Sequence, residues 1–121
     1  MKEKEKTDQK MYYRMLGGTG LQVSVLSFGF WATYGVKEGL TNEEGIIKAK
    51  ECMQIAREKG INLFDNAETY GNPPGTAEEI MGEVMSILQK ENQENWRRSE
   101  IIVSTKIFWG GTGVNERGLS R

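Results

Sequence analysis

The sequence predicts an α/β protein built around a parallel sheet. Short apolar runs typical of strands alternate with two longer segments in which apolar residues recur at the helical period. The order along the chain is hairpin, strand, helix, strand, helix, strand. Because strand–helix–strand units place their strands in parallel with right-handed crossovers, this order favours a single parallel sheet.

The first third of the chain predicts a β-hairpin followed by a buried strand. Strand-like runs at residues 11–16 and 21–24 flank residues 17–20, where three glycines favour a turn. The apolar run at residues 25–31 is consistent with a buried strand.

Two helices are predicted, and each opens with a Thr-x-x-Glu pattern in which the threonine can cap the helix. The first runs from Thr41 to a stop signal at Gly60, and the second begins at Thr76. The apolar residues that share one face of the second helix are Ala77, Ile80, Met81, Val84, Met85 and Leu88.

Each predicted helix is followed by a strand. Residues 62–64 form a short apolar run, and residues 101–105 are β-branched and apolar, which favours a strand. The polar residues 90–100, which include Trp96, predict a loop, and residues 108–121 are rich in glycine.

Composition narrows the functional classes. With 121 residues the chain is one domain or less, and we interpret residues 1–10 as a charged flexible leader and residues 11–121 as the domain. A net charge of −1 predicts no affinity for nucleic acid, and no apolar run is long enough for membrane insertion. Cys52 is the only cysteine and histidine is absent, so we expect a cytoplasmic protein without a metal site.

The predicted sheet is too small to be self-contained. Three parallel strands with two helices would leave an unpaired edge and one uncovered face, whereas parallel strands need burial on both faces. We therefore expect further βα units, either in additional sequence or in a partner chain.

Three ionisable side chains follow the ends of two predicted strands. Asp65 and Lys106 come directly after the strands, and Tyr70 lies in the loop that follows Asp65. Ligands of parallel α/β proteins bind at the carboxyl ends of the strands, where these side chains should gather.

This combination suits proton donation to a carbonyl oxygen that is being reduced by a hydride. An ammonium group close to a phenol favours its ionised form, and a carboxylate would keep the ammonium charged and oriented. The alternative is that Asp65 caps a turn, Tyr70 packs on the loop and Lys106 is solvated.

Several motifs resemble the aldo-keto reductase superfamily. They are Tyr13–Gly17, Thr19–Leu21, Val23–Ser24 and Gly29, which resemble its N-terminal hairpin and first strand, and Phe64–Gly71 and Thr105–Lys106, which resemble its second and third strands. Within the superfamily, residues 62–65, 96–99, 106–111 and 116–121 resemble the branch that contains voltage-gated potassium channel beta subunits. The resemblance implies the N-terminal part of a (β/α)8 TIM barrel, namely the hairpin and about three βα units.

The resemblance also implies roles for individual residues. Asp65, Tyr70 and Lys106 match three catalytic residues: an orienting carboxylate, the proton donor and the lysine that acidifies it. Trp31, Asp65 and Lys106 would contact the cofactor NADPH, and Trp31, Tyr70 and Trp109 would border the substrate pocket. For both tryptophans, simple packing is the alternative.

The sequence departs from the family pattern at two positions. Phe30 stands where threonine is common, which would weaken a polar contact to the cofactor, and Asn66 also replaces a common threonine. The family's fourth catalytic position and its phosphate-binding strands belong to later parts of the barrel.

Three functional hypotheses follow from the resemblance. The first is a reductase that converts aldehydes and ketones to alcohols with Tyr70 as proton donor, inactive as this chain alone. The second is a regulatory subunit that binds a channel cytoplasmic domain, in a branch that forms homo-oligomers. The third is a truncated chain without independent activity.

Overall fold

The computed structural model describes residues 10–35 and 42–119. Its elements, in chain order, are β1 (Tyr13–Met15), β2 (Gln22–Ser24), β3 (Phe28–Gly29), α1 (Asn42–Glu58), β4 (Leu63–Asp65), α2 (Thr76–Glu91), the 3-10 helix η1 (Arg98–Glu100) and β5 (Ile102–Ser104). The charged leader up to residue 9, the predicted cap Thr41 and the last two residues lie outside the described residues.

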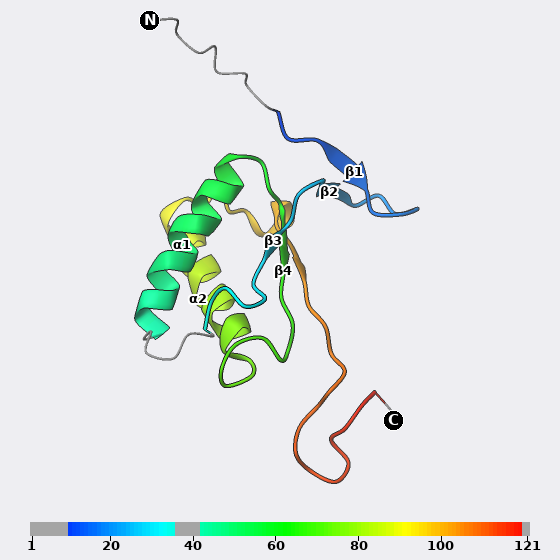
Figure 1. The fold of residues 1–121 in the computed structure, drawn as a ribbon. Helices are drawn as coiled ribbons and strands as arrows, with labels where there is room; N and C mark the ends of the chain where they lie inside the picture. The colour runs from blue at the N-terminus through cyan, green and yellow to red at the C-terminus, as the bar shows by residue number, and fades with distance from the viewer. Residues whose placement is uncertain (1–9, 36–41, 120–121) are drawn as a thin grey trace, which may run out of the picture.

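The parallel sheet predicted from the sequence is confirmed. Strands β3, β4 and β5 are parallel with β4 in the middle, while β1 and β2 form a separate antiparallel hairpin. Both helices lie on the same side of the sheet, and the hairpin lies at its amino-terminal end (Figure 1). The carboxyl ends of all three strands therefore meet at the opposite end.

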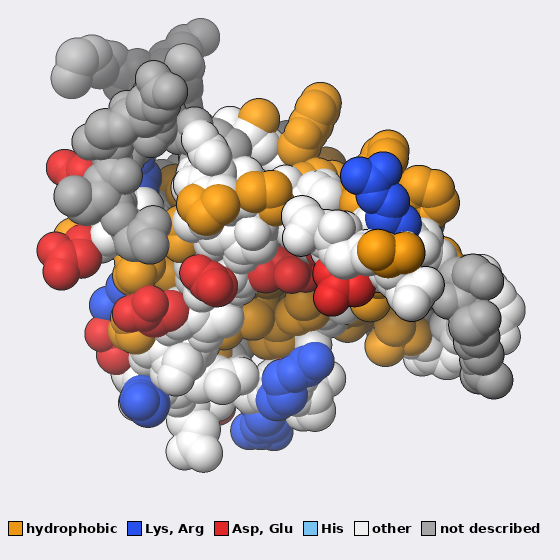
Figure 2. All heavy atoms as spheres, turned by 90° about the horizontal axis from the view of Figure 1, so that it is seen from below, with side chains coloured by type: hydrophobic (Ala, Val, Ile, Leu, Met, Phe, Trp, Pro, Cys, Tyr) orange, Lys and Arg blue, Asp and Glu red, His pale blue; other side chains and the backbone are white. Residues whose placement is uncertain are grey.

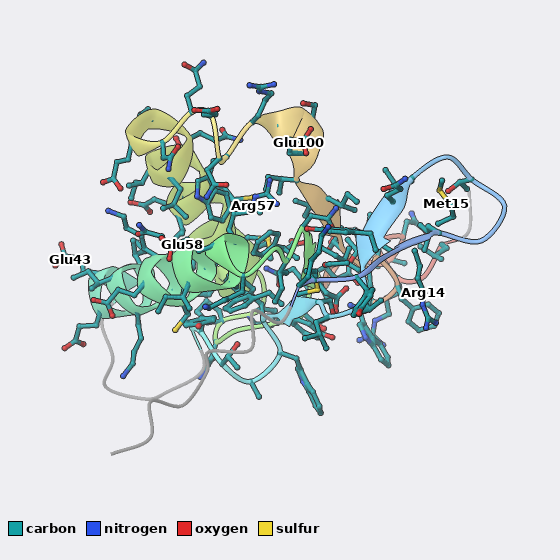
Figure 3. The ribbon with its side chains drawn as sticks, turned by 90° about the horizontal axis from the view of Figure 1, so that it is seen from above. Arg14, Met15, Glu43, Arg57, Glu58 and Glu100 are labelled. Carbon is teal, nitrogen blue, oxygen red and sulfur yellow. The ribbon has the colours of Figure 1, made fainter. Side chains whose placement is uncertain are left out.

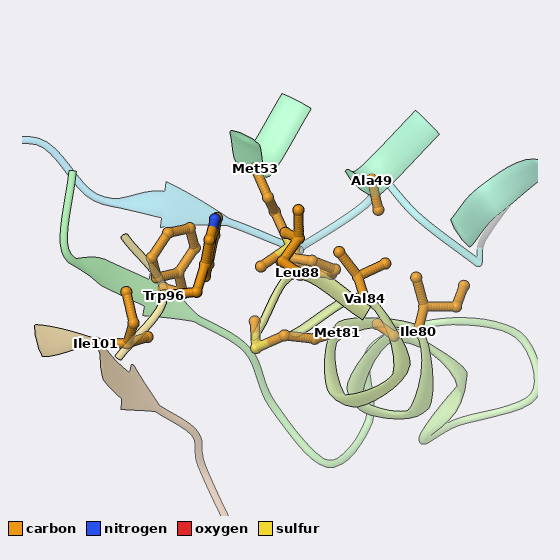
Figure 4. Packing of buried hydrophobic residues seen from close by; sticks show 11 residues of the cluster. Ala49, Met53, Ile80, Met81, Val84, Leu88, Trp96 and Ile101 are labelled. Atoms are coloured by element: carbon orange, nitrogen blue, oxygen red, sulfur yellow. The ribbon is translucent and has the colours of Figure 1, made fainter. Parts of the chain in front are cut away.

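The hydrophobic core lies between this sheet and the two helices. Helix α1 contributes Ala49 and Met53, and α2 contributes residues that recur every three or four positions: Ala77, Ile80, Met81, Val84 and Leu88 (Figure 4). Phe30 and Phe64 reach the same core from the sheet side. Because these residues share one face of each helix, the core is the one that the helical period predicts.

The loop predicted for residues 90–100 is shorter in the structure, because α2 continues to Glu91 and the 3-10 helix η1 occupies Arg98–Glu100. Within this loop, Trp96 is only 1% exposed and packs against Phe64 with 5.6 Å between the ring centroids. Trp96 fills the space between the end of α2 and the sheet, where its large apolar surface is removed from water.

Strand β3 is shorter than the strand predicted at residues 25–31. Only Phe28 and Gly29 pair with β4, and Leu26 is 60% exposed. Phe30 is fully buried in the core with its ring 4.9 Å from that of Tyr34, so its side chain packs between the sheet and the helices.

The predicted cap of the second helix is also wrong. Thr76 is the first helical residue, and the N-cap is Gly75, which makes no side-chain cap and has φ of 98°. The hydroxyl of Thr76 instead donates to the carbonyl oxygen of Pro73 at 2.7 Å. Glycine adopts this left-handed conformation without the strain that a Cβ would cause, so the turn before α2 favours glycine at position 75.

The hairpin is fastened to the sheet mainly by Asn62. The Oδ1 atom of Asn62 accepts a bond from the backbone nitrogen of Ser24 at 2.8 Å, and its Nδ2 atom donates to the carbonyl oxygen of Gln22 at 3.0 Å. Seen from above, the hairpin that carries Arg14 and Met15 stands apart from the two helices (Figure 3). Asn62, which directly precedes β4, thus anchors the β1–β2 hairpin to the parallel sheet.

Candidate active site

The register of the sheet places two polar residues opposite each other at the carboxyl ends of the strands. Asp65 is the last residue of β4 and pairs with Ser104, the last residue of β5. Beyond the strands the pairing continues, since the backbone nitrogen of Asn66 donates to the carbonyl oxygen of Ser104 at 2.8 Å. This continuation brings Lys106 alongside Asp65.

Asp65 and Lys106 form a bidentate ion pair. The Nζ atom of Lys106 lies 2.9 Å and 2.8 Å from the two carboxylate oxygens of Asp65, and it also donates to the carbonyl oxygen of Asn66 at 2.7 Å. The hydroxyl of Ser104 donates to Oδ1 of Asp65 at 2.6 Å. The three contacts of Nζ fix the position of the ammonium group, because each of its three donors has an acceptor, and the bond from Ser104 fixes the carboxylate.

The ion pair shifts both pKa values. Burial raises the pKa of Asp65, but hydrogen bonds from Lys106 and Ser104 outweigh it and hold the pKa of Asp65 below its ordinary value of 3.8. The hydrogen bond to Asp65 raises the pKa of Lys106 above its ordinary 10.5, although burial opposes this. Both groups are therefore charged across the neutral range.

Tyr70 lies beside this pair. The Nζ atom of Lys106 is 5.1 Å from the centroid of the Tyr70 ring, a distance at which a cation is attracted by the ring. The backbone of Tyr70 is also held, since its carbonyl oxygen accepts bonds from the nitrogens of Gly75 and Ala77 at the start of α2. The loop after β4 thus carries Tyr70 to the ion pair at a fixed position.

Gly71 is required by the tight turn after Tyr70. Its φ is 97°, and a Cβ at this position would lie 2.7 Å from the backbone nitrogen of Ala77. A larger residue would therefore clash with α2 and displace Tyr70.

The two tryptophans that the resemblance places beside the cofactor or substrate are largely exposed. Trp31, directly after the core residue Phe30, is 74% exposed, and Trp109 is 65% exposed. Trp31 precedes Ala32, whose φ of 54° is rare for a residue with a Cβ and is a strain of the kind often found at functional sites. Within the described residues, neither indole is buried in the core.

A hollow of about 510 Å³ lies in the loop after β5. It is lined by Phe108, Trp109, Gly110, Gly111, Arg117 and Gly118. Its lining does not include Asp65, Tyr70 or Lys106, so Trp109 borders a neighbouring space and not the ion pair itself. Viewed toward the carboxyl ends of the strands, the surface shows hydrophobic side chains interspersed with acidic and basic ones (Figure 2).

Three residues at this end of the sheet have roles that the sequence does not predict. Ser104 and Asn66 hold the ion pair, and Glu68 accepts hydrogen bonds from the backbone of the loop after β5. The register could have identified Ser104, because it must lie opposite Asp65 once residues 62–65 and 101–104 are aligned as parallel strands.

Residues 10–35 and 42–119 contain no cluster of metal-ligating side chains large enough to hold a metal ion. Within the same ranges, no helix combines the length and the apolar character needed to cross a membrane.

The ion pair predicts a pH dependence of stability. The pKa of Asp65 is lowered by folding, so its contribution is present above its unfolded pKa of 3.8 and is lost as pH falls through the lower folded value. Because the side chains of Asp65 and Lys106 are 35% and 53% exposed, screening limits this contribution to below about 1 kcal/mol. The free energies of unfolding of the wild type and of Asp65→Asn, measured with urea, should differ most above about pH 5, and the difference should shrink as pH falls below 3.8. A difference that stays constant down to pH 2 would contradict the assignment.

Comparison with known proteins agrees with these features. The sequence profile of the Aldo/keto reductase family matches residues 25–121. The chain is 50% identical over 111 residues to a protein of Arabidopsis thaliana and to one of Oryza sativa subsp. japonica, each described as a "probable voltage-gated potassium channel subunit beta". The matched region is 92% of this chain and 30% of each relative, so the chain spans less than a third of their length.

Solved structures give the same fold. A protein of Pseudomonas aeruginosa described as a "putative aldo-keto reductase" matches 88% of this chain and 35% of its own length, with a TM-score of 0.58 and 25% identity. A thermostable aldo-keto reductase in complex with the inhibitor epalrestat matches 82% of this chain and 32% of its own, with a TM-score of 0.58 and 26% identity. The hairpin and the three parallel strands are the N-terminal part of a TIM barrel, which does not close within the described residues.

The profile match covers most of the chain and coincides with the parallel sheet and its polar carboxyl end. The chain therefore belongs to the aldo/keto reductase family.

Proposed function

We propose that residues 11–121 are the N-terminal part of an NADPH-dependent reductase that converts aldehydes and ketones to alcohols in the cytoplasm. The observation that carries the proposal is the position of Lys106, whose ammonium group is bonded to Asp65 and lies 5.1 Å from the Tyr70 ring. A phenol, an ammonium group and a carboxylate at the carboxyl ends of parallel strands supply an acid for a developing alkoxide.

Each residue has a distinct part in the proposed reaction. Tyr70 donates a proton to the carbonyl oxygen of the substrate, and the positive charge of Lys106 stabilises the phenolate that remains. Asp65, fixed by Ser104, keeps Lys106 charged and oriented. When bound, NADPH supplies the hydride that reduces the carbonyl carbon.

The residues at this end are compatible with a nicotinamide cofactor. The exposed indole of Trp31 offers a flat apolar surface for a ring, and Asp65 and Lys106 offer polar partners beside it. Trp31, Tyr70 and Trp109 would border the substrate. The residues that hold the cofactor's phosphates belong to other parts of the barrel, so we expect residues 1–121 alone to bind NADPH weakly and to be inactive.

The test is hydride transfer by the longest gene product that contains this chain. Incubation with NADPH and a small aldehyde should consume NADPH, followed by absorbance at 340 nm, and should produce the alcohol in equal amount. Tight NADPH binding without any reduction of aldehydes or ketones would reject the reductase.

A regulatory role is the second candidate, because the plant relatives at 50% identity are described as potassium channel beta subunits. In this case the partner is the cytoplasmic domain of a channel, and the protein assembles with further copies of itself. Co-purification of such a domain with the gene product would support this role. Efficient aldehyde reduction, together with reproducible failure to bind any channel domain, would favour the enzyme.

A further inference from the structure

Glu68 makes a contact that the proposed reaction does not use. Its Oε1 atom accepts hydrogen bonds from three consecutive backbone nitrogens in the loop after β5: Phe108 at 2.8 Å, Trp109 at 2.5 Å and Gly110 at 3.4 Å. Three successive N–H groups directed at one oxygen form an anion-binding concavity, and here the anion is a side chain of the chain itself.

The backbone of Glu68 is tied to the same segment. Its nitrogen donates to the carbonyl oxygen of Lys106 at 3.2 Å, which extends the pairing between the segments that follow β4 and β5. Glu68 therefore bonds to Lys106 through its main chain and to residues 108–110 through its carboxylate. The side-chain bonds lower the pKa of Glu68, with the nitrogens of Phe108 and Trp109 contributing most, so the carboxylate is ionised at neutral pH.

The position of Glu68 links two parts of the candidate site. It lies between Asp65 and Tyr70 in the loop after β4, while the loop that it holds begins two residues after Lys106 and carries Trp109. Phe108 and Trp109 are more than half exposed, and their rings contact each other edge to face, with 5.0 Å between the centroids. Neither ring packs against the hydrophobic core, so the position of the backbone at Phe108 and Trp109 depends on its hydrogen bonds.

A second acidic residue shapes the far part of the same loop. Glu116 accepts a bond from the nitrogen of Gly113 through its side chain at 2.8 Å, and its carbonyl oxygen accepts one from Gly111 at 2.9 Å. Hydrogen bonds thus link residues 111–116 to one another, whereas the backbone of residues 108–110 is bonded to Glu68 in the loop after β4. The hollow that Trp109 lines lies in this loop.

We propose that Glu68 is a positioning residue that fastens the Trp109 loop to the loop carrying Tyr70, and so sets the place of Trp109 at the border of the substrate pocket. The effect on substrate rests on the proposed reductase function, whereas the fastening itself does not. Glu68 is not a catalytic residue in this proposal, because its carboxylate is occupied by the backbone of residues 108–110.

The fastening is tested by amide hydrogen exchange in the gene product, measured residue by residue with NMR. In Glu68→Ala the amides of Phe108, Trp109 and Gly110 should exchange roughly two- to tenfold faster, the range expected for loss of one ordinary hydrogen bond. Glu68→Gln keeps an acceptor oxygen without the charge and should give an intermediate increase. Glu83→Gln, which removes the same charge from an exposed position on α2, should leave all three amides unchanged.

The effect on substrate is tested with the same variants in the aldehyde reduction assay. Glu68→Ala should raise KM for the aldehyde while kcat and NADPH affinity change little, since Tyr70, Lys106 and Asp65 keep their contacts. Unchanged exchange at residues 108–110 in Glu68→Ala would overturn the fastening. Faster exchange with an unchanged KM in an active reductase would overturn the positioning role. If the wild type reduces no carbonyl, the reductase function fails while the exchange result still decides the fastening.

Discussion

Tyr70→Phe is expected to lower kcat for aldehyde reduction by roughly 10²- to 10⁴-fold while NADPH affinity stays nearly unchanged. The substitution removes only the hydroxyl that would donate the proton. The ring keeps its packing against the core, and the direct contacts between Asp65 and Lys106 do not involve the hydroxyl. The lost rate corresponds to about 3–5 kcal/mol of transition-state stabilisation.

The experiment compares steady-state turnover and NADPH binding in the gene product that contains this chain. Tyr12→Phe is the matched control, since Tyr12 is 75% exposed next to the hairpin and removing its hydroxyl should leave kcat within twofold. A Tyr70→Phe variant that turns over as fast as the wild type would remove Tyr70 from the acid role. Equal losses in kcat and in NADPH affinity would instead indicate that Tyr70 shapes the cofactor site.

The ion pair of the candidate site could be predicted because its position follows from strand ends. Once residues 62–64 and 101–105 are interpreted as neighbouring parallel strands, Asp65 and Lys106 must lie at the same edge of the sheet. The structure adds the bidentate geometry and the bond from Ser104, which depend on register. The catalytic roles of Asp65, Tyr70 and Lys106 stay predictions until turnover is measured.

Glu68 could not be found in the same way. A glutamate in a loop between a strand and a helix looks solvated, since nothing in the local sequence indicates a partner forty residues further on. Its partners are backbone nitrogens, which every residue except proline carries, so residue types at positions 108–110 give no signal.

The error at Thr76 also has a physical reason. The Thr76 pattern fits a capping box, yet Gly75 with its positive φ takes the N-cap position, so Thr76 becomes the first helical residue. Here a backbone requirement outweighed a short local motif.

The open face of the sheet agrees with the length of the relatives. Both helices cover one side of β3, β4 and β5, while Val103 of β5 and Leu26 before β3 are 39% and 60% exposed (Figure 1). In a closed barrel the corresponding side is packed by residues from the other strands. This arrangement supports the prediction that further βα units complete the sheet, in a family whose members here are about three times longer.

Trp96→Ala is expected to destabilise the fold by about 3–5 kcal/mol, the cost of emptying a large aromatic site in a core. Trp96 is 1% exposed and contacts Phe64 of the central strand, so its removal leaves a cavity between α2 and the sheet. Since a domain is stable by only about 5–15 kcal/mol, this loss would remove much of the total. Trp96→Phe, which keeps a ring in the site, should cost less and should still fold.

Urea unfolding followed by circular dichroism measures both variants, because the signal does not depend on the tryptophan that is removed. The control is Trp31→Ala: Trp31 is 74% exposed, and its loss should change the free energy of unfolding by no more than about 0.5 kcal/mol. If Trp31→Ala and Trp96→Ala were equally mild, Trp96 would not close the core at the end of α2.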